Sequence, residues 1–179
     1  MEVYPSLGKY KFITTYTDFK KLVSIVTKVN YKKTEYEILD EYVYSDKLIV
    51  DEHTSNENSK FRETSNEIKQ LIRKYGIENF FSNDKAEAFQ SEINVYRQKW
   101  EVINIDIEKM HFVLNGYFNE NRIKIPAKIN DDWMYEIKDF KLKECLEGKI
   151  YHRIFTLFHA IEGIRSADFK DFLWMRINR

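Results

Sequence analysis

Residues 100–108, WEVINIDIE, carry the pattern on which the predicted fold class depends. Ile103, Ile105 and Ile107 occupy every second position, which is the period of a β-strand with one buried face. Two later segments continue the pattern: residues 110–118, MHFVLNGYF, are aromatic and β-branched, and residues 121–129, NRIKIPAKI, alternate isoleucine with basic residues. With residues 131–140, DDWMYEIKDF, added, the sequence predicts an antiparallel meander of three or four strands.

The first 50 residues predict one helix and one hairpin. Residues 17–31, TDFKKLVSIVTKVNY, place apolar side chains at helical spacings, with Thr17 or Asp18 available as the cap and an end near Asn30. Residues 34–52, TEYEILDEYVYSDKLIVDE, indicate a β-hairpin that turns around Ser45 and Asp46, although the alternation slips between Leu39 and Tyr42.

A polar, apolar-poor segment follows the hairpin, and residues 52–63 are expected to form a flexible loop. Thr64 and Glu67 have the spacing of a capping box at the start of a helix, and Gly76 provides a left-handed stop. Asp84 and Glu87 are a start signal for a further helical piece. At 179 residues the chain is expected to form a single domain, residues 1–179.

The C-terminal part is predicted to be helical over residues 150–164, with a break at Gly163, Ser166 and Asp168 before a last helical segment. The expected fold class is therefore α+β. An antiparallel sheet, made of the meander and the N-terminal hairpin, is flanked by N- and C-terminal helices.

Composition excludes several classes of protein. One cysteine, Cys145, excludes a disulfide framework within the chain and any multi-thiolate zinc site. No apolar run reaches the length of a membrane span, and residues 1–12 lack the apolar core of a secretory signal, so the expected location is cytoplasmic with no membrane partner. The formal net charge is +0, which gives no general attraction to nucleic acid. A basic segment, residues 9–33, precedes an acidic one, residues 35–57; the two either neutralise each other or form a docking surface.

The richest chemistry lies in residues 151–165, YHRIFTLFHAIEGIR. In a helix His152 and His159 are separated by about 10 Å along the axis, so they cannot both ligate one metal ion, and no metal or other cofactor is expected. Arg153 is followed by five residues and then by His159, and this spacing resembles the Arg-x4-to-6-His element of HEPN-type ribonucleases. The resemblance covers these residues alone and implies a histidine that transfers a proton beside an arginine that offsets phosphate charge.

Two further patterns point to nucleic acid. Glu136 and Lys138, with Asp131 and Asp132 upstream, form a pair of the kind that metal-dependent nucleases use, although such alternation is common on exposed strands. Residues 9–21 interleave lysines with three aromatic residues, Tyr10, Phe12 and Tyr16. These rings could stack on bases, or the segment could be an edge strand whose lysines prevent pairing with another chain.

The sequence as a whole favours a small intracellular protein-binding module without catalysis of its own. An inhibitor or immunity-type protein of bacterial or phage origin fits this profile by analogy. Its expected partner is another protein, and nucleic acid enters only under the alternative of a HEPN-like ribonuclease or abortive-infection component that uses Arg153 and His159. The predicted binding anchors are aromatic or guanidinium side chains, Trp100, Trp133, Tyr135, Trp174 and Arg176.

Overall fold

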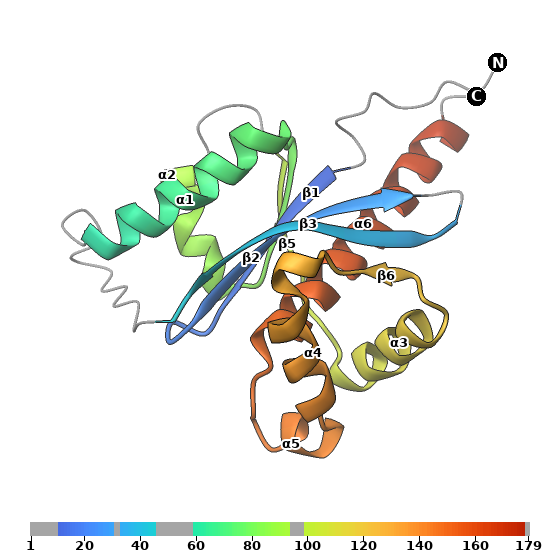
Figure 1. Cartoon of the computed structure of the whole chain (residues 1–179). Coiled ribbons are helices and arrows are strands. Elements are labelled where there is room, and N and C mark those ends of the chain that lie inside the picture. The colour runs from blue at the N-terminus through green and yellow to red at the C-terminus, as the bar shows by residue number, and fades with distance from the viewer. Residues whose placement is uncertain (1–10, 31–32, 46–58, 94–98, 178–179) are drawn as a thin grey trace.

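The computed structural model describes residues 11–30, 33–45, 59–93 and 99–177, with side chains up to residue 167. Within these residues one mixed sheet has the strand order β5-β4-β1-β2-β3-β6 (Figure 1). Its β1–β4, β4–β5 and β3–β6 pairs are parallel, and its β1–β2 and β2–β3 pairs are antiparallel. The prediction of an α+β fold with an antiparallel sheet is therefore wrong.

The first three strands, β1 (Lys11–Thr17), β2 (Leu22–Asn30) and β3 (Glu35–Tyr44), are consecutive and antiparallel. The helix predicted to end near Asn30 is thus wrong. Every residue from Leu22 to Thr27 is buried, because both faces of β2 are covered. A strand covered on both faces carries a continuous apolar run, which has no alternation to distinguish it from a helix.

Strand β3 is the first half of the predicted hairpin, and its partner is the preceding strand β2. Val26 pairs with Asp40 and Thr27 with Ile38, so Leu39 is an additional residue in β3 and explains the slip in alternation. The rest of the predicted hairpin and the loop up to residue 58 lie outside the described residues. Lys28 and Glu37 face each other across this pair, with Nζ and Oε2 3.9 Å apart, so the two charged segments neutralise each other in part.

The middle of the chain contains α1 (Ser59–Tyr75), β4 (Asn79–Ser82), the 3-10 helix η2 (Lys85–Phe89), α2 (Gln90–Ile93) and β5 (Lys99–Val102). Helix α1 begins before the predicted capping box, and Thr64 is buried inside it, so both that start and the loop over residues 59–63 are wrong. The stop at Gly76 is confirmed by its φ of 63°. The start at Asp84 is confirmed as well, because its side chain accepts a hydrogen bond from Lys85 N.

The predicted meander is mostly helical. The structure has α3 (Ile107–Asn119), the short strand β6 (Ile123–Lys124), η3 (Ala127–Ile129), α4 (Asn130–Asp139) and α5 (Leu142–Leu146). Asp106 caps α3, since its carboxylate accepts hydrogen bonds from Glu108 N and Lys109 N. Met110 and Leu114 are both buried, and their spacing of four is the helical period that the β-branched composition concealed.

The last helix, α6 (His152–Ile177), is continuous, so the predicted break after Gly163 is wrong. Gly163 allows α6 to approach the sheet closely. A Cβ atom at this position would lie 2.5 Å from Phe81 Cγ. Among the helices described here, none is both long enough and apolar enough to cross a bilayer.

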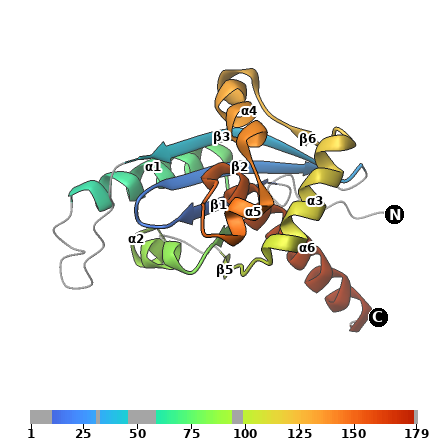
Figure 2. The same cartoon turned by 90° about the horizontal axis from the view of Figure 1, so that it is seen from below.

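Helices cover both faces of the sheet. Helices α1 and α2 lie on one face, and α3 to α6 lie on the other (Figures 1 and 2). Each face has its own buried core. The first is built from Ile13, Leu22, Phe80 and Phe89, and the second from Phe12, Phe81, Trp133 and Phe158, among others. Strands β1 and β4 contribute to both cores and are thus central to the fold.

Candidate functional site

The carboxyl ends of β1, β4 and β5 meet on one side of the sheet, because these three strands are parallel. In open α/β sheets ligands bind at this side. Helix α6 packs against β1 and β4 and starts beside their ends. We call the polar side chains that gather there the strand-end cluster: Tyr16, Asp18, Asn83, Asp84, His152 and His159.

Asp18 is the first residue after β1, and its carboxylate organises the turn into β2. Its Oδ1 accepts hydrogen bonds from Lys20 N at 3.0 Å and Lys21 N at 2.9 Å. His152 Nε2 lies 3.1 Å from the same oxygen, but this ring nitrogen has no aligned hydrogen bond to any described residue. Burial opposes the charge on Asp18, yet these amides and His152 outweigh it and lower the pKa of the carboxyl. Asp18 is therefore an anion that ties the turn to α6.

Tyr16 lies at the centre of the cluster, between the two histidines of α6. Its ring centroid is 6.0 Å from that of His152 and 5.3 Å from that of His159. Burial raises the pKa of Tyr16 to about 12, and the negative charges of Asp18 and Asp84 act in the same direction. The phenol thus stays protonated at neutral pH.

Asn83 joins the ends of β1 and β4. Its Nδ2 donates to Thr17 O at 2.7 Å, and its Oδ1 accepts from Thr17 N at 3.2 Å and Ala86 N at 3.3 Å. The side chain replaces strand pairing where the two backbones separate, so both faces of the amide are occupied. Asp84, which follows, is exposed and caps η2.

His159 is buried inside the fold, with 2% of its surface exposed. Its Nδ1 lies 2.6 Å from Phe155 O. Burial lowers the pKa of His159, although the backbone oxygens of Phe155 and Ile103 and the charge of Asp84 oppose the shift. His159 is thus a neutral residue that links α6 to the end of β5.

Nucleases that use two metal ions hold them with clustered carboxylates. Within the described part of the chain, no three His, Cys, Asp or Glu side chains are placed to hold one metal ion. Asp18 already accepts two backbone amides through one oxygen, and Asn83 is an uncharged amide whose oxygen already accepts from Thr17 N and Ala86 N. The strand-end cluster therefore does not fit a two-metal centre.

Arg153, one half of the proposed HEPN pair, lies in a separate cluster of acidic residues. Its guanidinium donates to both carboxylate oxygens of Glu41 at 3.1 Å and to Asp132 Oδ2 at 3.2 Å, and it lies 3.9 Å from Glu136 Oε2. Burial alone would lower the pKa of Arg153, but these carboxylates outweigh it and raise the pKa. We call this cluster the arginine clamp, because it fastens α6 to β3 and α4.

Two carboxylates of the predicted nuclease pattern, Asp132 and Glu136, are members of the arginine clamp. Both lie on helix α4, where Glu136 Oε1 accepts from Ile154 N and helps to cap α6. Arg153 and His159 are six residues apart on one helix, so their side chains point about 120° apart around its axis. The structure thus assigns them different partners, while the HEPN resemblance itself stays an untested prediction.

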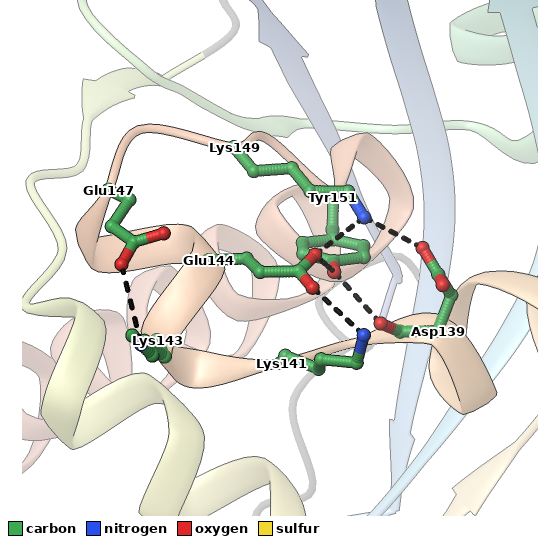
Figure 3. A network of polar contacts seen from close by, with 7 residues as sticks. All are labelled: Asp139, Lys141, Lys143, Glu144, Glu147, Lys149 and Tyr151. Carbon is green, nitrogen blue, oxygen red and sulfur yellow. Dashed lines mark hydrogen bonds and ion pairs between the residues drawn. The ribbon is translucent and has the colours of Figure 1, made fainter.

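A second polar network, formed by residues just before α6 and by residues of α4 and α5, also fixes the start of α6 (Figure 3). Lys149 Nζ contacts Asp139 Oδ2 at 2.9 Å and Glu144 Oε2 at 2.7 Å, and Tyr151 OH donates to Asp139 O or to Glu144 Oε2. Lys149, followed by Lys141 and Tyr151, lowers the pKa of Glu144 to about 2. This network holds α4, α5 and α6 together and thereby positions His152.

The predicted protein-binding anchors are dispersed over the molecule. Trp133 is fully buried and donates from Nε1 to Glu41 Oε2, and Trp100 stacks on Phe80 with ring centroids 3.8 Å apart. Tyr135 is exposed on α4. The side chains of Trp174 and Arg176 lie outside the described residues. The structure does not bring the anchors that it describes into one surface.

The sequence alone indicates Asp18 and Asp84 as helix caps and does not single out Asn83. The available signal was a polar residue directly after a short apolar segment. Asp18 follows β1 and Asn83 follows β4 without an intervening residue.

Several solved structures share this fold, although no protein-family model and no curated protein matches the sequence. The large terminase of a thermophilic bacteriophage superimposes with a TM-score of 0.63 at 11% identity, over 90% of this chain and 42% of that one. The nuclease domain of the bacteriophage P22 large terminase gives 0.53 at 8% identity, over 92% and 91%. The yeast mitochondrial Holliday junction resolvase gives 0.52 at 10% identity, over 90% and 82%.

The chain therefore shares the fold of these three structures. It spans less than half the length of the thermophilic phage terminase. The prediction of a protein-binding inhibitor or immunity-type module is wrong, because the structures that share this fold include a terminase nuclease domain and a Holliday junction resolvase. The expectation that nucleic acid is an unlikely partner except under the HEPN-like alternative is corrected by the same two likenesses. Phage origin remains compatible with two of these three likenesses.

Proposed function

We propose that this chain acts on nucleic acid as a nuclease-type domain, and that it holds the polynucleotide at the carboxyl ends of β1 and β4. The observation that supports the proposal most strongly is the fold. The P22 terminase nuclease domain and the resolvase are similar to this chain over most of their own lengths, so the likeness extends over whole domains.

The charges beside the strand-end cluster support this position. Lys20 and Lys85 are exposed and Lys21 is half-buried, and all three flank the ends of β1 and β4. None of them forms an ion pair with a described residue, so their ammonium groups are available to phosphates. Phosphate contacts of this kind position a nucleic acid and supply most of its non-specific affinity. A zero net charge does not oppose such a local surface.

The proposal is tested by fluorescence anisotropy with labelled single-stranded DNA, blunt duplex DNA and RNA at two salt concentrations. The same mixtures, incubated with Mg²⁺, Mn²⁺ or EDTA, are then run on denaturing gels to detect cleavage. The variant Lys20→Glu/Lys85→Glu reverses two charges beside the cluster. Lys143→Glu is the matched control, because its side chain is 87% exposed on the distant helix α5.

We expect at least one form of nucleic acid to bind and binding to weaken as salt rises. The double variant should lose roughly tenfold in affinity and part of the salt dependence, while Lys143→Glu should bind like wild type. A chain that neither binds nor cuts any of these nucleic acids at low salt would contradict the proposal.

A further inference from the structure

The turn between β1 and β2 carries an aromatic residue, Phe19, that is part of neither buried core. Phe19 has a φ of 68°, in the left-handed region that a bulky residue seldom adopts. Its side chain is half-buried. Glycine or asparagine would adopt this conformation with less strain, so packing and turn geometry do not explain a phenylalanine here.

The turn is held in this shape by side chains on both sides of Phe19. Thr17 Oγ1 accepts from Phe19 N at 3.0 Å and donates to Lys21 O at 2.9 Å. Asp18 Oδ1 accepts the amides of Lys20 and Lys21. A strained residue that its surroundings fix in this way is a feature that collects at ligand-binding sites.

One basic group lies over the ring, and two more adjoin Phe19 in the chain. Lys85 Nζ, from the first residue of η2, lies 5.8 Å from the centroid of the Phe19 ring, within the range of a cation–π contact. Lys20 and Lys21 follow Phe19 directly in the chain. A flat apolar face bordered by ammonium groups is the arrangement with which proteins bind unpaired nucleotides, since the base stacks on the ring and the cations contact phosphate.

We infer that Phe19 is a stacking platform for an unpaired base, and that single-stranded nucleic acid is the preferred ligand of this edge. The inference rests on the proposed function and specifies its ligand. In an intact duplex each base is already stacked between its neighbours, so the ring of Phe19 has no free base face to contact. Residues 9–21 are rich in lysine and aromatic residues. Of the aromatic rings that the structure describes there, Phe12 and Tyr16 are buried, so Phe19 is the ring that a base can reach.

The test compares wild type with Phe19→Gly and Phe19→Trp in anisotropy titrations of labelled oligo-dT and of a blunt duplex. Phe19→Gly removes the ring and also the backbone strain, so its melting temperature should equal or exceed that of wild type. Its affinity for oligo-dT should fall roughly tenfold, and its affinity for the duplex should stay within about twofold. Phe19→Trp should retain binding, because it preserves an aromatic face.

The control for loss of an exposed phenylalanine is Phe112→Ala on α3, where the side chain is 80% exposed, and it should bind oligo-dT like wild type. Equal binding of oligo-dT by wild type and Phe19→Gly would overturn the inference and leave the proposed function standing. Preference of the wild type for the duplex would overturn the inference as well. Absence of all binding by the wild type would instead contradict the proposed function.

Discussion

Gly163 of α6 lies directly against the ring of Phe81 of β4, and this contact brings the histidine-bearing helix onto the central strands. Phe81 is 2% exposed and stacks on Phe12 with ring centroids 5.4 Å apart, so its ring has little room to move. The closeness of α6 to the sheet therefore depends on the absence of a side chain at position 163, and the strand-end cluster depends on that closeness.

Gly163→Ala is expected to destabilise the protein, because a methyl group would lie within 2.5 to 2.8 Å of three carbons of the Phe81 ring. Overpacking of this kind costs about 1–3 kcal/mol of unfolding free energy. Gly116→Ala in α3 is the matched control: its Cβ would meet nothing within 4 Å, and alanine is favoured in a helix by up to about 1 kcal/mol. Urea denaturation measures the unfolding free energy of both variants. Equal stability of the two would contradict the packing account.

Arg153→Ala should lower stability by about 3 kcal/mol, because it leaves the carboxylate of Glu41 buried without its cation. The side chains of Arg153 and Glu41 are only 11% and 7% exposed. Arg165→Ala removes an arginine that is 45% exposed and whose Nη1 lies 3.7 Å from Glu162 Oε2, so it should cost under about 0.5 kcal/mol. A small loss for Arg153→Ala, similar to that of the control, would show that the arginine clamp does not hold α6 in place.

Stability should fall in acid through Asp40. Burial alone would raise the pKa of its carboxyl, but hydrogen bonds from Lys128, Lys74 and Tyr75 outweigh it and hold the pKa well below its usual range. The unfolded carboxyl has a pKa of about 3.9, so the stabilisation is complete above that pH and is lost as pH falls toward the lower folded pKa.

Asp40→Asn should therefore cost roughly 1 kcal/mol at pH 7 and flatten the decline in stability between about pH 5 and pH 2. Urea midpoints across this pH range measure the effect. If wild type and variant lose stability in parallel, Asp40 is not the group responsible.

Binding of nucleic acid is expected not to require a divalent cation. The strand-end cluster lacks the carboxylate set of a two-metal centre, and the phosphate contacts that we propose come from the lysines beside it. Affinities measured in EDTA and in Mg²⁺ at matched ionic strength should agree within about twofold. A Mn²⁺ binding isotherm that disappears in Asp84→Asn, or binding that appears only with metal, would show that the cluster is a metal site after all.

Local signals in the sequence predicted the parts of the fold that depend on neighbouring residues. Gly76 ends α1 in the left-handed conformation, and Asp84 caps η2, as the residue types indicate. The prediction failed where tertiary burial decides the element. Strand β2 is covered on both faces, so all residues from Leu22 to Thr27 are buried, and the apolar ones, which only Ser24 interrupts before Thr27, have no strand period.

The candidate site was not predictable for a related reason. Asp18 and His152 are far apart in the chain, and only the parallel pairing of β1 with β4 and the docking of α6 bring the cluster together. The contact between Phe19 and Lys85 depends on the same pairing. The sequence did show that residues 9–21 combine lysines with aromatic rings, but the solvent-accessible ring is Phe19, in the turn, and Phe12 and Tyr16 are buried.

The most direct test of the account is hydrogen–deuterium exchange of the free protein and of the protein saturated with oligo-dT. We expect the added protection to concentrate in residues 16–21, 83–86 and 152–159, which form the strand-end cluster and the turn of Phe19. Protection confined to α1 and α2 on the opposite face of the sheet, or exchange unchanged at saturation, would contradict the claim that this edge binds nucleic acid.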